Sequence, residues 1–190
     1  MTKLKREYIW GVDLSLSETG FAVSKYEKLD IVYITTILTR HITDDPERLL
    51  RLEYIARELI ELQKKYPPKL IVAERAFVNN NFRNTAQALS EVHGLFKGLM
   101  GMMGNRNMIY YPPQSIKAAI YKGQCSKEAI QQKLLQELPD LSFSKKKSGK
   151  LNDNEADAVG AIVTYFIKER KLKWNKDLSL KSTRKIINGK

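Results

Sequence analysis

The chain has 190 residues, 43% of them hydrophobic, which predicts one globular domain with a substantial core. It has no run near the roughly 18 apolar residues of a membrane span. Its basic start precedes no apolar signal region, and its single cysteine, Cys125, excludes an internal disulfide. These features predict a cytoplasmic protein with no membrane partner. The net charge of +12 favours polyanionic partners, above all nucleic acid.

Positive charge is concentrated in two segments. Residues 168–190 hold nine Lys or Arg against two acids, which accounts for +7 of the net +12. Four more lysines lie in SKKKSGK, at 144–150. Neither segment has hydrophobic periodicity, so we expect loop-like chain that either contacts phosphates or only aids solubility. We therefore divide the chain into a domain over 1–170 and a basic tail over 171–190.

The N-terminal part predicts three strands in succession. The segments are rich in Ile, Val, Thr and aromatic residues, and they cover 9–14, 20–25 and 29–38. Their links are short, which favours an antiparallel meander.

Helices and strands alternate through the rest of the chain. Asp45 and Pro46 suit the N-cap and first position of a helix that Pro67 and Pro68 end. We then expect a strand at 70–73, a helix at 84–103, a strand at 108–111, helices at 115–121 and 126–138, a loop at 139–152 and a closing helix at 153–170. This order predicts an α/β protein with a mixed sheet flanked by helices.

Three acids stand in apolar surroundings. Asp13 interrupts the first strand, Glu74 directly follows the run LIVA, and Asp157 lies within a small, apolar helix. Buried carboxylates are costly unless they are paired or bind a metal ion. Adjacent strand ends and a helix packed across them would bring the three together, and their oxygens suit Mg²⁺ or Mn²⁺.

Each acid also has an ordinary explanation. Asp13 can begin a turn, Glu74 can pair with Arg75 or a lysine, and Asp157 can face solvent. A chance arrangement of all three, in this order on this pattern, is much harder to accept.

The motifs around these acids resemble those of RuvC-like Holliday-junction resolvases, which belong to the RNase H-like superfamily. The three motifs are GVDLSLSETGFAV, IVAERAFVNNNFRNTAQALSEVHG and NEADAVGAIVTYF. The match spans residues 8–167 and leaves only the basic tail uncovered. The first and third motifs are weak alone, but the three with this spacing form a fairly strong signature.

The resemblance implies an RNase H-like fold with a mixed five-stranded sheet, in which a meander is followed by parallel strands. It implies a Mg²⁺- or Mn²⁺-dependent endodeoxyribonuclease that cuts four-way junctions and other branched DNA in a bacterial or phage-infected host cytosol. Two metal ions about 4 Å apart would serve the attacking and leaving oxygens. Asp13 would be the shared ligand, Glu74 would lie on the water side, and Asp157 would hold the other ion.

One position departs from the family pattern. The fourth metal ligand of the family is an Asp or His three residues before the last aspartate, and here that residue is Asn154. Its amide oxygen can bind a metal ion but supplies no charge. Asp153, four residues before Asp157, lies on the same helical face and can replace it, or can instead cap the helix.

The resemblance also assigns DNA contacts. Phe77, three residues after Glu74, would stack on unpaired bases at the branch point, although a core role is almost as plausible. SIKAAIYKG and the lysine that follows it resemble the family's basic DNA-contacting segment. Lys117, Lys122 and Lys127 are therefore expected to contact phosphates or, alternatively, to form an ordinary solvated basic face.

Three glycines recur at helical spacing in the long central helix. Gly94, Gly98 and Gly101 each cost helix stability, which a close helix–helix approach would justify. The resembled family dimerises through this helix, so a homodimer is expected, but packing within one subunit explains the glycines equally well. His93 is expected to pack or to lie at an interface.

Three other functions compete with this one. An actin-like ATPase also has an aspartate after its first strand, but 190 residues leave no room for its second domain. Asn154 motivates a non-catalytic junction-binding protein. An RNase H-fold nuclease that acts on RNA or on RNA–DNA hybrids would share the three acids.

Overall fold

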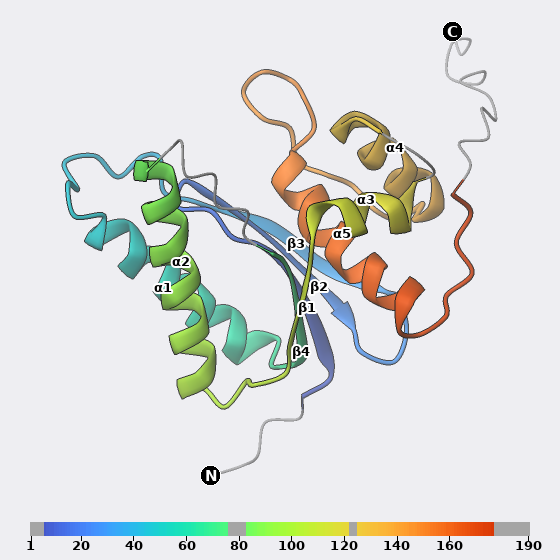
Figure 1. Ribbon diagram of the computed structural model, residues 1–190, viewed down its shortest axis with the longest axis horizontal. Coiled ribbons are helices and arrows are strands. Elements are labelled where there is room, and N and C mark those ends of the chain that lie inside the picture. The colour runs from blue at the N-terminus through green and yellow to red at the C-terminus, as the bar shows by residue number, and fades with distance from the viewer. Residues whose placement is uncertain (1–5, 76–82, 122–124, 177–190) are drawn as a thin grey trace, which may run out of the picture.

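A central sheet separates two groups of helices in the computed structural model, which describes residues 6–75, 83–121 and 125–176 (Figure 1). The helices α1 (Leu49–Lys65) and α2 (Arg83–Met102) cover one face. The other face carries α3 (Pro113–Ile120), α4 (Lys127–Glu137) and α5 (Asp153–Lys168). The predicted helices are therefore confirmed, with ends that differ by a few residues.

The sheet has five strands in the order β3-β2-β1-β4-β5. They are β1 (Tyr8–Asp13), β2 (Glu18–Lys25), β3 (Ile31–Leu38), β4 (Pro68–Glu74) and β5 (Met108–Tyr111). The first three form an antiparallel meander, while β4 pairs in parallel with both β1 and β5. The mixed sheet predicted from the element order is thus confirmed.

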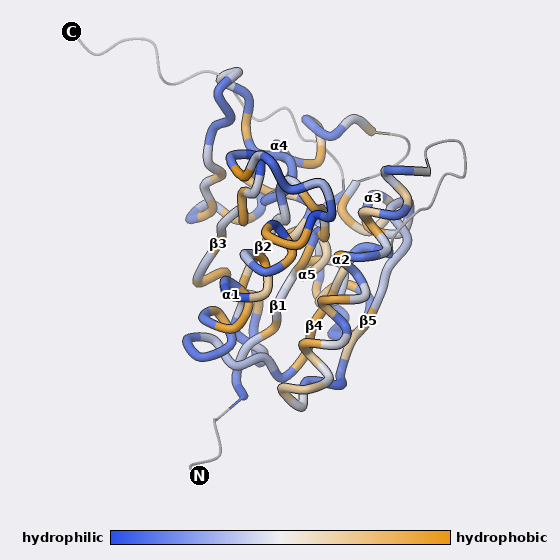
Figure 2. Tube along the Cα trace, turned by 90° about the vertical axis from the view of Figure 1, so that its left-hand side faces the viewer, coloured by the Kyte–Doolittle hydropathy of each residue, from blue (hydrophilic) through white to orange (hydrophobic). Residues whose placement is uncertain are grey.

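Strict alternation along the strands divides the apolar residues between two cores. On β1, Ile9 belongs to the core on the α5 side, whereas Trp10 and Val12 belong to the core beneath α1 and α2. This follows from the two-residue period of a strand. The hydropathy colouring of Figure 2 shows the apolar segments of β1 and β4 in the interior, between the helices.

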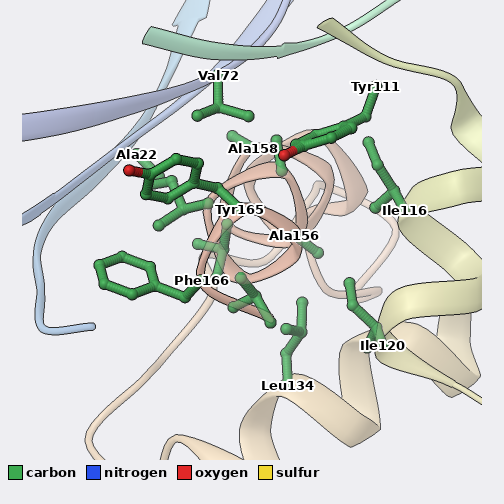
Figure 3. Close-up of a cluster of buried hydrophobic side chains, with 14 of the residues drawn as sticks. Ala22, Val72, Tyr111, Ile116, Ile120, Leu134, Ala156, Ala158, Tyr165 and Phe166 are labelled. Atoms are coloured by element: carbon green, nitrogen blue, oxygen red, sulfur yellow. The ribbon is translucent and has the colours of Figure 1, made fainter. Parts of the chain in front are cut away.

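Helix α5 is buried along most of its length because other elements surround it. Val72 of β4 and Ala22 of β2 lie on one side of it, and Ile120 of α3 and Leu134 of α4 lie on another (Figure 3). A helix in such a position needs apolar residues all round, and Ala158 to Phe166 are all buried. The acids of α5 are therefore confined to its first two turns and its lysine to its last turn.

The start of α1 differs from the expectation that Asp45 and Pro46 open it. Arg48 has a φ of 59°, in the left-handed region, and the helix begins only after it. The Asp45 carboxylate still accepts hydrogen bonds from the backbone N–H groups of Leu50 and Arg51, at 3.1 and 3.0 Å. Asp45 thus acts as a cap from outside the helix, across a turn that the sequence pattern did not reveal.

Two segments predicted as loop-like have defined contacts. In the loop before α5, Lys145 and Leu151 form an isolated antiparallel bridge, and Phe143 is buried. At the start of the predicted tail, the Trp174 indole donates a hydrogen bond to the Ile120 carbonyl at 3.0 Å. Within the described ranges, no helix is long and apolar enough to span a bilayer.

Candidate active site

The site begins where two neighbouring parallel strands end. Asp13 is the last residue of β1 and Glu74 is the last residue of β4. Val12 and Ala73, which precede them, are register partners. The two carboxylates therefore project from adjacent positions at the same edge of the sheet, as the sequence predicted.

Both acids face α5. Side chains two residues apart on a strand point to the same face. Ile9 of β1 and Val72 of β4 both belong to the core around α5, so Asp13 and Glu74 continue those two rows. The side chains of β1 and β4 that face α5 are thus apolar along the strands and acidic at the strand ends.

Two glycines allow α5 to approach this edge closely. A Cβ atom on Gly11 would collide with the carbonyl of Ala158, and one on Gly20 would collide with the carbonyl of Asn154. Only glycine fits at these two strand positions without moving the helix. The first turns of α5 consequently lie against β1 and β2, which brings Asp157 to the acids of β1 and β4.

The electrostatics show that these three carboxylates form one cluster. Burial, followed by the charges of Asp157 and Glu74, raises the pKa of Asp13 to about 7. Burial and the charge of Asp157 also raise the pKa of Glu74 to about 7. Burial raises the pKa of Asp157 as well, although Lys127 opposes the shift. Like charges gathered in a poorly solvated place explain all three shifts.

Two lysines balance part of this negative charge. The Lys127 ammonium lies 3.0 Å from Asp157 and 3.2 Å from Asp153, and Lys146 forms a further ion pair with Asp153. Burial opposes the shift, but hydrogen bonds from Lys146 and Lys127 lower the pKa of Asp153 to about 2. Asp153 is therefore ionised, and Lys127 links it to Asp157 of the cluster.

The proposed capping role of Asp153 is wrong. Asn152 is the N-cap of α5, and its side chain accepts a hydrogen bond from the backbone N–H of Asn154 at 3.2 Å. Asn and Asp cap almost equally well, so the sequence could not decide between adjacent residues. Asp153 occupies the first helical position and is left available for the site.

Sequence reasoning missed Glu18. This residue opens β2, and one of its carboxylate oxygens accepts a hydrogen bond from the side-chain amide of Asn154 at 2.9 Å. Glu18 stands in the polar segment SLSET, where an acid attracts no notice. The GVDLSLSETG spacing could have revealed it, because Glu18 and Gly20 share one face of β2.

Comparison with known proteins identifies the family of this chain. The family model described as Crossover junction endodeoxyribonuclease RuvC matches residues 9–165. The chain belongs to this family. A RuvC of Desulforamulus reducens is 30% identical over 160 residues, covering 83% of this chain and 91% of the relative. A RuvC of Fusobacterium nucleatum is 28% identical over 159 residues, covering 82% and 78%.

Solved structures agree on the RNase H-like fold. Thermus thermophilus RuvC in complex with Holliday junction substrate superposes with a TM-score of 0.69 at 18% identity, covering 87% of this chain and 96% of that one. The yeast mitochondrial Holliday junction resolvase gives a TM-score of 0.59 at 13% identity, covering 86% and 80%. The RuvC-like fold expected from the three motifs is therefore confirmed.

Members of the RuvC family are metal-dependent nucleases, and the donor set here fits such an ion. Asp13, Glu74 and Asp157 offer hard carboxylate oxygens, which suit Mg²⁺ or Mn²⁺. Their mutual repulsion is what a bound cation relieves. Over the described ranges, no three His, Cys, Asp or Glu side chains are already arranged to hold a metal ion. The Lys127 ammonium instead lies between Asp153 and Asp157.

The predicted DNA-contacting residues have different outcomes. Lys127 lies in the site itself. Lys117 is exposed, and its charge acts on both Glu74 and Asp157. Phe77 and Lys122 lie outside the described residues.

Proposed function

We propose that this RuvC family member hydrolyses phosphodiester bonds in four-way junctions and other branched DNA. The main support for this function is the cluster of Asp13, Glu74 and Asp157, which the ends of β1 and β4 and the start of α5 hold together in a poorly solvated place. A stable fold tolerates such repulsion poorly, so a role in binding cations accounts for it. Family membership and the junction bound to the Thermus thermophilus relative support the choice of substrate.

The acids would act as ligands of two Mg²⁺ or Mn²⁺ ions. We assign Asp13, Glu74 and Asp157 to this role, with Asp153 and Asn154 completing the set. The bound ions would supply an activated water and stabilise the leaving oxygen. In the sheet, Asp13 lies between Glu74 on β4 and the residues of β2, which suits its role as the shared ligand.

The positive residues around the cluster would hold the DNA backbone. Lys127 and Lys117 act electrostatically on the acids and can bind the phosphate next to the cleaved bond. Lys146 anchors the loop at 144–150 to Asp153 and thereby keeps this basic segment beside the site. Its exposed lysines are Lys145, Lys147 and Lys150. Lysines on one side of an active site bind phosphates regardless of base sequence.

A homodimer formed through α2 completes the proposal. In the described part of the chain, no atom beyond the adjacent residues and the local backbone of α2 lies within 4 Å of the Cβ position of Gly94, Gly98 or Gly101. Packing inside one subunit therefore does not explain these glycines, whereas an approaching second α2 would. The proposed location is the cytoplasm of a bacterium or of a phage-infected host, which rests on the composition alone.

The test compares three labelled substrates of equal length: a synthetic four-way junction, a linear DNA duplex and an RNA–DNA hybrid duplex. Each is incubated with Mg²⁺, Mn²⁺ or EDTA. We expect paired nicks in the junction only, and only with metal. The variant Asp13→Asn should still bind the junction without cutting it, because the basic surface is unchanged.

The outcomes separate the competing functions. Preferred cutting of the RNA–DNA hybrid would show that the protein acts as an RNase H-type nuclease. Junction binding with no metal-dependent nicking by the wild type would make it a non-catalytic binding protein. Nicking by Asp13→Asn at the wild-type rate in Mg²⁺ would overturn the active site itself.

A further inference from the structure

Glu18 lies beside the acidic cluster but on a third strand. It opens β2, which pairs with β1 so that Gly20 is the register partner of Asp13. Glu18 and Gly20 are two residues apart, so both face α5. The Glu18 side chain is only 14% exposed, which places its carboxylate between the sheet and the first turn of α5.

Both oxygens of the Glu18 carboxylate have partners. One accepts an ion-pair contact from Arg40 at 3.2 Å. The other lies 2.9 Å from the amide nitrogen of Asn154 and 3.5 Å from the Lys146 ammonium. Arg40 and Lys146 hold this carboxylate from two sides, so it is placed to act on Asn154 as a hydrogen-bond acceptor.

An amide side chain has two different ends. Nitrogen donates hydrogen bonds and oxygen accepts them, so only one orientation of Asn154 offers a ligand to a cation. An aspartate at this position has two equivalent acceptor oxygens and needs no such selection. Glu18 accepts only, so it must face the nitrogen of Asn154, and the carbonyl oxygen is then the atom left for the site.

The start of α5 is fixed without Glu18. Asn152 caps the helix and donates from its side chain to Thr36 at 2.9 Å. Glu155 accepts two hydrogen bonds from Ser144, at 2.8 and 2.7 Å. This second network holds the helix and the loop before it, so the contact between Glu18 and Asn154 is not needed to form the turn.

We infer that Glu18 is a positioning residue of the active site, which orients the Asn154 amide so that its oxygen serves as a metal ligand. The inference rests on the proposed function, because it gives Asn154 a place in the metal site. It gives a neutral residue at the start of α5 a defined place among the carboxylates of the site. Here the orientation of the amide is imposed from β2.

A double-mutant cycle tests this inference. Glu18→Ala is made in the wild type and in an Asn154→Asp background, and Mn²⁺ binding is measured by calorimetry and by the signal of free Mn²⁺ in electron paramagnetic resonance. In the wild type we expect Glu18→Ala to weaken Mn²⁺ binding by about 10- to 100-fold, the usual effect of losing a group that orients a ligand. In Asn154→Asp, the same change should have no effect or strengthen binding, because Glu18 there only repels a second carboxylate.

Two further variants serve as controls for the loss of the Glu18 ion pair and of its acceptor oxygen. Arg40→Ala removes a partner of Glu18 that does not touch Asn154, and it should change Mn²⁺ binding little. Glu18→Gln keeps an acceptor oxygen at the same reach, so it should bind Mn²⁺ more tightly than Glu18→Ala. Thermal unfolding in EDTA monitors the fold of each variant, and Glu18→Leu, which keeps the side-chain volume but has no acceptor, replaces Glu18→Ala in the cycle if the alanine variant does not fold.

The result that would overturn the inference is an equal loss of Mn²⁺ affinity from Glu18→Ala in both backgrounds, because a general electrostatic or structural role does not depend on residue 154. This failure is distinguishable from that of the proposed function. A background-dependent effect on Mn²⁺ binding in a protein that cuts no junction supports the inference and refutes the substrate. If the protein cuts junctions but Glu18→Ala weakens Mn²⁺ binding equally in both backgrounds, the substrate is supported and the inference about Glu18 is refuted.

Discussion

The ammonium group of Lys127 lies 3.0 Å from a carboxylate oxygen of Asp157, one of the three acids of the cluster. Burial disfavours the charged lysine, yet the carboxylates of Asp157 and Asp153 raise the pKa of Lys127. The lysine also lowers the pKa values of Asp13 and Glu74 against the effect of burial. In the metal-free protein, therefore, a cation that belongs to the chain offsets part of the repulsion in the site.

The metal-free protein should lose stability as the pH rises toward neutrality. The pKa of Asp13 is raised from 3.8 to about 7 and that of Glu74 from 4.5 to about 7. A raised carboxyl pKa contributes stability that is full below the unfolded pKa and is lost as the pH passes the folded pKa. Asp13→Asn removes one such group, so in EDTA its melting temperature should exceed that of the wild type at about pH 8 by a few degrees and much less at about pH 5.

Lys127→Met should change the melting temperature in the direction opposite to Asp13→Asn. It removes the cation from the cluster, so in EDTA at about pH 8 it should lower the melting temperature, while at about pH 5 protonated carboxyls make its loss less harmful. If both variants follow the pH dependence of the wild type, the carboxylates are not coupled as described.

Asp153→Asn should raise the Mg²⁺ concentration needed for cleavage by more than about 10-fold, since a charged ligand is removed from the site. Asn152 still caps the helix, but the ion pairs of Asp153 with Lys127 and Lys146 are lost, so the melting temperature in EDTA should fall modestly. The measurement is a Mg²⁺ titration of junction nicking, with Glu128→Gln, an exposed acid of α4, as the matched control. Near-normal nicking at limiting Mg²⁺ would assign the fourth position to Asn154 alone.

Gly98→Leu should separate the dimer without disturbing the subunit. The Cβ position of Gly98 is open among the described residues, and leucine favours a helix over glycine by about 1 kcal/mol. We expect unchanged or higher melting temperature together with a shift to monomers in sedimentation velocity. Junction cutting should change from paired to single nicks. A dimer of undiminished affinity would place the interface elsewhere.

The sequence predicted the acids of the site because each violated its surroundings. Asp13 and Glu74 end apolar strands, and Asp157 interrupts an apolar helix. Their apolar neighbours in the sequence therefore indicated that these acids are buried and that they have a chemical role. The structure adds that two-residue alternation directs both strand acids to the same helix, α5. The meander and the later βα units predicted a mixed sheet, and the structure confirms it.

What escaped prediction depends on neighbours that are distant in sequence. Glu18 contacts Asn154, 136 residues later, and the polar composition of SLSET does not single it out, although its spacing from Gly20 places it on the face toward α5. Asp45 caps α1 only because Arg48 adopts a positive φ, which residue identity does not foretell. The choice between Asn152 and Asp153 as cap was undetermined because the two residue types cap almost equally well.

The basic tail should contribute to DNA binding in two separable parts. Residues 177–190 carry four Lys or Arg and one acid, whereas residues 171–176 carry three lysines and the anchored Trp174. Removing 177–190 should weaken binding to all DNA shapes and leave stability and hydrolysis intact. For each phosphate that the shortened protein no longer neutralises, the slope of log affinity against log salt should become shallower by about 0.9.

Removing 171–190 should additionally lower stability, because Trp174 packs on the core around α5 and donates to the Ile120 carbonyl. Trp174→Ala in the full chain is the matched control: it should reproduce the decrease in melting temperature while the salt slope stays that of the wild type. Binding is measured by fluorescence anisotropy with a junction and a linear duplex over a range of KCl concentrations. Equal salt slopes for the full chain and the form that ends at Lys176 would show that residues 177–190 bind no phosphates, and the positive charge that binds DNA would then lie with Lys117, Lys127 and the loop at 144–150.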